Sequence, residues 1–363
     1  MGFELHFSDD DWTRIERDWT AWWAGELDRP MVLLETFNPL YFGDLRIFSR
    51  EWMLELPVDQ VLDLYEEKLE KASFYGDAWP KFFYNHGPGM GAGFLGATVH
   101  SMPEQRTIWF EAPRQIPIQE LSLAFDPDNV WWRRIRDLTR GAVERWGNRV
   151  AVAHTDIGGN MDVLASFRTT QQLLYDLVDA PDEVLRLSRE ITAAWLRYYN
   201  ELYEIIAPAG RGTCNWAAVW SPQRTYMTQS DFCYMISPKM FERFVAPDLE
   251  TCYAAMEHGF YHLDGKGQLP HLDRFLAMEN LAGIQWIAGA GQPPPEDWPD
   301  VLKRIVAADK RCQLYVTAEG ARKIVRELGG KGFALYVVNR MTPEEAEDFL
   351  KVLAAEDIGR RSS

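Results

Sequence analysis

Short apolar runs alternate with amphipathic segments along most of this chain, most regularly from about residue 150 onward. The apolar runs are hydrophobic at nearly every position, which is typical of strands in a parallel sheet covered on both faces. In the segments between them, apolar residues recur every three to four positions, as on one face of a helix. The pattern predicts a series of strand–helix units.

Eight runs are expected to be strands: 31–37, 81–85, 150–156, 213–220, 259–264, 283–289, 312–318 and 333–338. Helices are expected at 170–178, 181–206, 237–258, 271–278, 298–309, 319–328 and 342–355. Ser237 and Thr342 each precede a proline, and this pairing of a cap with a first-turn proline favours a helix start. Eight strands alternating with helices predict a closed (β/α)8 TIM barrel. An open doubly wound sheet is the alternative, but no Gly-rich dinucleotide motif follows an early strand, and no nucleotide cofactor is expected.

The segment 86–130 departs from this alternation. HGPGMGAGFLG (86–96) is too rich in glycine for a helix and predicts a loop whose backbone approaches another segment closely. RTIWFEAP (106–113) predicts an extra hairpin strand, and we expect this insertion to cover the barrel mouth. The expected organisation is an N-terminal helical extension over 1–30, one barrel domain over 31–356 and a tail over 357–363.

Composition narrows the class of protein. The net charge is −16 and no long basic run occurs, which argues against nucleic acid as a partner. No stretch approaches the roughly 20 apolar residues of a membrane helix, and the N-terminus lacks a secretory signal. The four cysteines, at 214, 233, 252 and 312, lack paired spacing, so we expect a reducing compartment and a cytoplasmic protein.

The strongest candidate for chemistry is FYHLDGKGQ (260–268), where an apolar run ends in His262 and Asp264. Residues two apart on a strand share a face, so both side chains should point to the carboxyl-end mouth where such barrels carry out catalysis. The pair could ligate a metal, or Asp264 could orient His262 for acid–base work. It could also be only the polar end of a buried strand.

His154 and Asp156 repeat this spacing, and Asp156 is a third catalytic candidate, although it could simply cap the Gly158–Gly159 turn. Trp216, Trp220 and Arg224 suit a carboxylated or hydroxylated ring substrate, because indole rings stack on rings and Arg binds carboxylates; core packing explains the tryptophans equally well. Six other residues at or near predicted strand ends belong to the expected substrate-binding set: Glu35, Asn85, His86, Trp286, Tyr315 and Tyr336. Asn160, close behind Asp156, and Asp231, which follows the strand of Trp216 and Trp220, complete it.

Four segments together resemble the uroporphyrinogen decarboxylase superfamily, which includes zinc-dependent methyltransferases that act on corrinoid proteins or coenzyme M. They are DIGGNMDVLASFRTTQQLLYDLVDAPDEV (156–184), QSDFCYMISPKMFERFVAPDLE (229–250), YHLDG (261–265) and TPEEAEDFL (342–350). The resemblance covers about 200 residues and implies a (β/α)8 enzyme. The Arg-rich N-terminal stretch that holds the tetrapyrrole in the decarboxylase has no counterpart here.

In the family's zinc methyltransferases, a His-x-Cys pair and a cysteine on the last strand hold the metal. This chain is similar at His262, but Asp264 stands in place of the first cysteine and Tyr336 lies about where the second would fall. The resemblance therefore implies a diverged subgroup, in which zinc or another divalent metal at His262 and Asp264 is an open prediction.

The expected function is transfer of a methyl group from a small methylated compound to a corrinoid, carried by a partner protein, or to a thiol. A decarboxylase of the uroporphyrinogen type and a non-catalytic binding subunit are the alternatives. A homodimer is left open.

Overall fold

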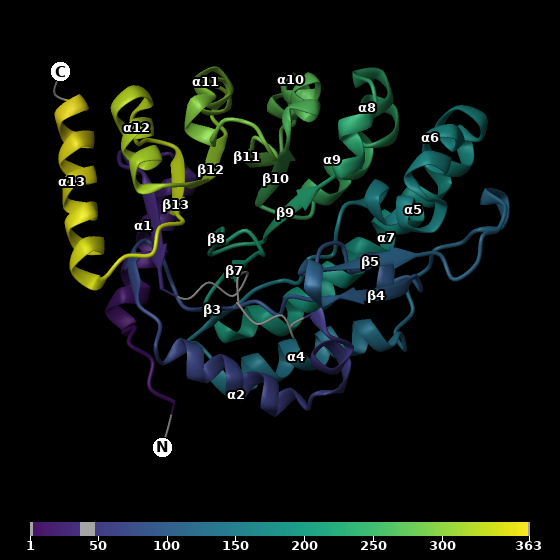
Figure 1. The fold of residues 1–363 in the computed structure, drawn as a ribbon, viewed down its shortest axis with the longest axis horizontal. Coiled ribbons are helices and arrows are strands. Elements are labelled where there is room, and N and C mark those ends of the chain that lie inside the picture. Colours follow the sequence, from purple (N-terminus) through teal and green to yellow (C-terminus); the bar gives the residue numbers. More distant parts are fainter. Residues whose placement is uncertain (1–2, 37–47, 362–363) are drawn as a thin grey trace.

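The computed structural model describes residues 3–36 and 48–361. Its centre is a seven-stranded sheet in the order β2-β1-β13-β12-β11-β10-β9, surrounded by helices (Figure 1). Every neighbouring pair in this sheet is parallel except β1 with β2. The strands are β1 Met31–Glu35, β2 Phe74–Gly76, β9 Thr225–Gln229, β10 His258–Asp264, β11 Leu281–Ile287, β12 Arg311–Val316 and β13 Phe333–Val337. The expectation of a mainly parallel α/β fold is confirmed.

Three shorter ladders accompany the main sheet. β3 (Lys81–Phe82) pairs in parallel with β6 (Ala151–Val152), and β7 (Thr213–Cys214) pairs with β8 (Trp220–Ser221). A bridge between Ala153 and Cys214 connects β6 with β7. The third ladder is a hairpin of β4 (Thr98–Met102) and β5 (Thr107–Glu111), as the sequence predicted for this insertion. In the described part of the chain, these ladders do not join into one closed ring, so the closed barrel is not shown.

Helices form an arc around the strands, with α13 next to α12 at one side (Figure 1). They are α1 Asp9–Ala24, α2 Val58–Leu69, α3 Gly91–Phe94, α4 Val130–Trp146, α5 Asn160–Arg168, α6 Thr170–Asp179, α7 Pro181–Ile206, α8 Pro238–Phe244, α9 Ala246–Tyr253, α10 Leu272–Leu276, α11 Pro299–Ala307, α12 Ala318–Leu328 and α13 Pro343–Arg361. None of these described helices has the length and apolar character needed to cross a lipid bilayer.

Two sequence expectations need correction. The helix expected at 237–258 is two helices, because Pro247 cannot donate a backbone hydrogen bond and α8 ends before it. The strand expected at 213–220 is interrupted by a turn in which Ala218 has φ +58° and the Asn215 side chain accepts hydrogen bonds from the amides of Ala217 and Val219. Trp216 and Trp220 therefore do not share one strand face.

The Gly-rich loop makes the close backbone approach that its composition predicted. The amides of Met90 and Gly91 donate to the carbonyls of Asp156 and Ile157, both at 2.9 Å. At Gly158, where φ is +89°, a Cβ atom would lie 2.6 Å from the Cα of Gly89. A side chain at that position would separate the two segments. Coverage of the mouth by the adjoining hairpin stays a prediction.

Helix α1 lies across the amino ends of the strands. Trp23 stacks on His258, the first residue of β10, with ring centroids 4.2 Å apart. Arg311, the first residue of β12, donates to the carbonyls of Trp22 and Trp23. The indoles of Trp12, Trp19, Trp22 and Trp23 are all buried, so part of this chain's tryptophan content forms core at the amino end.

Candidate functional site

A row of polar side chains crosses four adjacent strands around His262. In the strand register, His262 on β10 is paired with Gln229 on β9 and with Gln285 on β11, and Gln285 is paired with Gln313 on β12. Paired positions point to the same side of a sheet, so the four side chains lie next to one another. We call these four residues the polar row.

Hydrogen bonds connect three members of the polar row. Nδ1 of His262 contacts Oε1 of Gln285, and Nε2 of Gln285 donates to Oε1 of Gln313. On its other side, Nε2 of His262 lies 3.8 Å from Oδ2 of Asp264. The ring of Trp216 meets the His262 ring edge to face, with centroids 5.0 Å apart. The imidazole is therefore held between an amide, a carboxylate and an indole.

The charge around His262 favours its protonated form. Burial alone would lower the pKa of this histidine, but the contacts with Asp264 and Gln285 and the negative charges of Asp264 and Asp231 outweigh it and raise the pKa. The result is an imidazole that keeps its proton to a higher pH than usual and can act as a general acid.

Asp156 lies at the other end of the polar row. Its carboxylate accepts a hydrogen bond from the amide of Gly158 at 2.9 Å, and Nε2 of Gln229 lies 3.4 Å away. Burial raises the pKa of Asp156 to about 7, against the lowering effect of backbone hydrogen bonds and of His262. Burial and the charge of Asp231 also raise the pKa of Asp162, whose oxygens accept from the amides of Asp231 and Phe232.

A cavity of about 320 Å³ opens beside Asp264. Its lining comes from the segments that follow β9, β10 and β11: Asp231, Tyr234, Asp264, Gly265, Lys266, Ala288, Gly289, Ala290 and Gln292. A cavity at the carboxyl ends of parallel strands is the usual place for a substrate in an α/β enzyme. Asp264, the carboxylate 3.8 Å from Nε2 of His262, is part of this lining.

A second polar cluster lies between β1, β3 and β13. Lys81 and Glu35 form a buried ion pair, and the hydroxyl of Tyr336 donates to the same carboxylate. Tyr315 packs against Tyr336 with ring centroids 5.3 Å apart. Three predicted site residues, Glu35, Tyr315 and Tyr336, are thus brought together, but around a lysine that the sequence analysis did not select.

Other predicted site residues lie away from His262. Trp286 packs on the outer face of the sheet against Trp298, at 5.4 Å. Trp220 donates to the carbonyl of Arg211 and accepts, through its own carbonyl, from Trp23 of α1. Trp286 therefore fills the core outside the sheet, and Trp220 fills the core beside α1 at the amino end.

Arg224 extends toward α7, where it donates to Asn200 and lies 3.9 Å from the ring centre of Tyr203. His154 stacks on Tyr199 of the same helix at 4.6 Å, and burial lowers its pKa to about 4.

Two predicted residues of the Gly-rich segment have local partners. Nε2 of His86 contacts the carbonyl of Met53 at 2.9 Å, and burial lowers the pKa of His86 to about 3. Asn85 accepts from the amide of Gly87 at 2.8 Å. These contacts of Asn85 and His86 fix the start of the Gly-rich loop.

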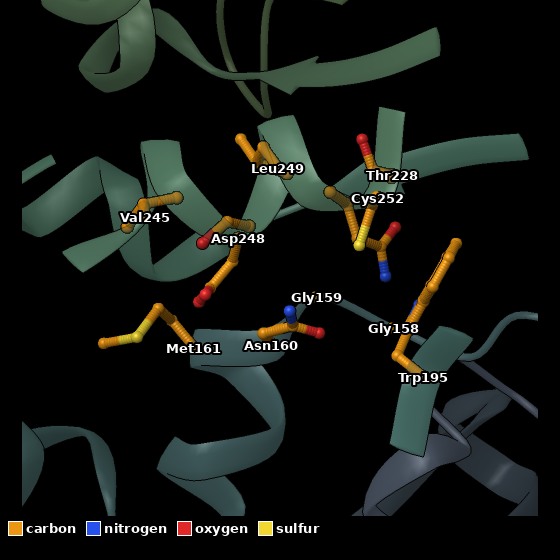
Figure 2. Close-up of a pocket in the computed structure, with 12 residues that line it drawn as sticks. Gly158, Gly159, Asn160, Met161, Trp195, Thr228, Val245, Asp248, Leu249 and Cys252 are labelled. Atoms are coloured by element: carbon orange, nitrogen blue, oxygen red, sulfur yellow. The ribbon is translucent and has the colours of Figure 1, made fainter. Parts of the chain in front are cut away.

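Asn160 lines a separate small pocket at the start of α5 (Figure 2). It donates to Thr192 at 2.7 Å, and Asp248, whose pKa is raised by burial, lies across the pocket on α9. The volume of about 20 Å³ is close to the ~10–15 Å³ that one water molecule requires, which makes this pocket too small for a substrate.

Sequence reasoning missed Gln229, Gln285, Gln313 and Lys81. For Gln285 and Gln313, the available signal was a glutamine inside a largely apolar strand, as in LAGIQWI and RCQLYV. Burying such a side chain costs free energy unless it has a partner, so it seldom occurs without a reason.

The metal predicted at His262 and Asp264 needs further ligands. All four cysteines are buried, and burial raises the pKa of each thiol, which disfavours the thiolate form that zinc prefers. Among the residues described, no three or more His, Cys, Asp and Glu side chains are arranged to hold a metal ion. A thiolate-type zinc centre does not fit, and we assign no metal to this pair.

Comparisons with known proteins complete the description. No protein-family model and no curated protein sequence matches this chain. Its structure is similar to that of a methyltransferase from Methanosarcina mazei, with a TM-score of 0.62 and 12% sequence identity over 94% of this chain and 98% of that one. Similarity at this level of identity concerns the fold. The chain therefore shares its fold with a methyltransferase over nearly its whole length.

Proposed function

We propose that this protein is a methyl-transfer enzyme that demethylates a small compound bound in the cavity beside His262 and Asp264. The observation that carries the proposal is the imidazole of His262, held between Gln285 and Asp264, of which Asp264 lines that cavity. The fold shared with a methyltransferase supports the reaction class.

The chemistry requires an acid. When a methyl group leaves an oxygen, nitrogen or sulfur atom, the electron pair of the broken bond stays on that atom, which becomes more basic. A nucleophilic acceptor supplies the pair for the new bond to carbon. Nε2–H of His262 would protonate the leaving atom, and such general-acid help contributes roughly 10²–10⁴-fold. The neutral imidazole then regains its proton from solvent.

The other residues around His262 have distinct roles in this proposal. Asp264 and Asp231 stabilise the imidazolium, and Trp216 packs against its ring. Asp156, with a pKa of about 7, is suited to exchange protons at the far end of the polar row. The acceptor would be a corrinoid on a partner protein or a thiol. None of these steps uses a metal ion.

The finer fold belongs to the same proposal: a closed (β/α)8 barrel of the uroporphyrinogen decarboxylase-like superfamily. Contacts across the gaps between ladders support it. The Lys81–Glu35 ion pair joins β3 to β1, and the Ala153–Cys214 bridge joins β6 to β7.

Decarboxylation of a tetrapyrrole has less support. Its substrate carries several carboxylates, whereas Asp231 and Asp264 make the described cavity lining acidic and Lys266 is the single cation in that lining. Like charges would repel such a substrate.

Purified protein should be incubated with methylated amines, thioethers and methoxy compounds, with cob(I)alamin or a thiol as acceptor. Methylcobalamin absorbance and mass spectrometry would detect transfer. We expect His262→Gln to lose roughly 10²–10⁴-fold in rate. His271→Gln, a matched control whose histidine is buried against the carbonyl of Cys233, should retain the wild-type rate.

Equal rates in wild type and His262→Gln would contradict the proposal, as would no transfer from any donor to either acceptor. Release of carbon dioxide from uroporphyrinogen would favour the decarboxylase instead.

A further inference from the structure

We infer that Gln285 is a positioning residue that keeps a proton on Nδ1 of His262 and leaves Nε2 on the side of Asp264, and that Gln313 fixes the orientation of Gln285. The role in turnover rests on the proposed function. The structural role does not, because it concerns only the hydrogen bonds of the polar row.

The first step is the direction of the hydrogen bonds. Nε2 of Gln285 donates to Oε1 of Gln313, so the carbonyl oxygen of Gln285 is directed at Nδ1 of His262. A carbonyl oxygen accepts, and therefore Nδ1 must carry a proton. In the neutral ring, this leaves the lone pair on Nε2, on the side of Asp264.

The second step is that the opposite amide orientation conflicts with the charges. A reversed Gln285 would direct its NH2 group at Nδ1, and that arrangement is unfavourable whenever His262 is protonated, because both ring nitrogens are then donors. The carboxylates of Asp264, Asp231 and Asp156 all interact favourably with a protonated His262. With its carbonyl oxygen facing His262, Gln285 can accept a hydrogen bond from Nδ1 in both the neutral and the protonated imidazole.

The third step concerns the cost of the arrangement. Gln285 and Gln313 are fully buried at 0% exposure, and Nε2 of Gln313 has no hydrogen-bond partner among the described residues. An unpartnered buried donor costs free energy, so two apolar residues would make this part of the sheet more stable. A purely structural role does not account for such a pair, whereas control of the imidazole does.

The test uses NMR of protein labelled with ¹⁵N at histidine, with the His262 signal identified by its loss in His262→Gln. In the wild type at alkaline pH, the ¹⁵N shifts should report a neutral ring protonated on Nδ1. Gln285→Leu removes the acceptor, so we expect a shift toward the Nε2–H tautomer and a lower pKa. Gln285→Glu keeps an acceptor and adds negative charge, so Nδ1 should stay protonated and the pKa should rise.

Gln268→Leu is the matched control. Gln268 is also fully buried, but its side chain accepts from the hydroxyl of Tyr261 and does not touch His262. Its replacement should leave the His262 signals unchanged. Wild-type tautomer and pKa in both Gln285 variants would overturn the inference, and so would pKa changes of the same sign in both. If Gln285→Leu fails to fold, Gln285→Glu and Gln313→Leu decide the matter.

Failure of this inference and failure of the proposed function can be told apart. The NMR measurement needs no substrate, so a shifted tautomer in a protein without methyl-transfer activity would preserve the inference and remove the function. If the protein is active, Gln285→Leu should lower kcat more than it raises KM, and Gln285→Glu should recover part of kcat.

Discussion

Single residues around His262 determine the pH at which it can act. Its raised pKa depends mainly on the contact with Asp264, which opposes the effect of burial. The sequence predicted this pair correctly as neighbours, because residues two apart on a strand share a face. It could not predict that the glutamines are partners of His262, since partners on adjacent strands depend on the strand register, which one apolar run does not reveal.

The pH profile of methyl transfer tests the role of Asp264. If protonated His262 is the active form, the rate should fall as the pH rises through the pKa of His262. Asp264→Asn removes a contact that raises this pKa, so the alkaline limb should move to lower pH by roughly one unit. Asp273→Asn on α10, an exposed ion-paired carboxylate, serves as the control. An unmoved limb in Asp264→Asn would argue against His262 as the acid.

Asp156 makes a prediction about stability. Its pKa is about 7 in the folded protein and 3.8 in its ordinary state, so the folded state binds the proton more tightly. The stability gained from this proton is complete below pH 3.8 and is lost as the pH rises through about 7. Asp156→Asn should remove that loss, which is worth roughly 4 kcal/mol at most.

Urea unfolding at about pH 5 and about pH 8 would measure the effect, and the variant's advantage over wild type should grow with pH. Asp137→Asn on α4, an exposed carboxylate, should give no such growth. A constant difference between the two pH values would mean that burial does not disfavour the charged Asp156.

Packing between elements explains where sequence patterns succeeded and failed. α7 was predicted over its full length, because 26 residues with a consistent apolar face leave little ambiguity. The run 213–220 is equally apolar but folds as a turn between two short strands, because the Asn215 side chain replaces strand hydrogen bonds. β9 was not predicted, since TYMTQ is buried by its neighbours although it contains three polar residues.

Substitutions of Lys81 on β3 and Glu35 on β1 should have strongly coupled effects on the free energy of unfolding. Lys81→Met would leave Glu35 buried without its cation, and we expect a loss of about 3–5 kcal/mol in unfolding free energy. The double variant Glu35→Gln/Lys81→Met should regain much of it, because no unpaired charge remains. Denaturant unfolding of the four proteins in this cycle gives the coupling, and additive losses would contradict it.

Contact between the Gly-rich loop and the turn at Gly158 can be tested by one methyl group. Gly158→Ala places a Cβ 2.6 Å from the Cα of Gly89, while Gly96→Ala, also at positive φ, meets nothing within 4 Å. Both should lose about 1–2 kcal/mol from backbone strain. Gly158→Ala should lose clearly more stability than Gly96→Ala in thermal or urea unfolding. Equal losses would show that the loop moves away from the added methyl group at little cost.

At the scale of the whole molecule, the fold was more predictable than the chemistry. The alternation of strands and helices predicted a parallel α/β protein because burial on both faces of a sheet leaves a strong pattern. Metal binding leaves a weaker sequence pattern. A His-x-Asp pair can supply two metal ligands, and it can equally supply a general acid with the carboxylate that orients it. We expect prolonged dialysis against a chelator to leave the methyl-transfer rate within about twofold of the untreated enzyme. Loss of activity that zinc restores would reinstate the metal at His262 and Asp264.

The tryptophans of α1 restrict how molecules can reach the interior. Trp19 and Trp22 pack against Trp79 and Phe260, and Trp23 covers the start of β10, so indole rings block the described amino end of the strands. The cavity beside Asp264 lies at the opposite end of the strands. In the proposed reaction, donor, product and acceptor would all enter and leave by this cavity, and a bulky acceptor bound there would trap a compound that had entered first. Turnover in the proposed reaction would accordingly depend on the order in which substrates bind and products are released.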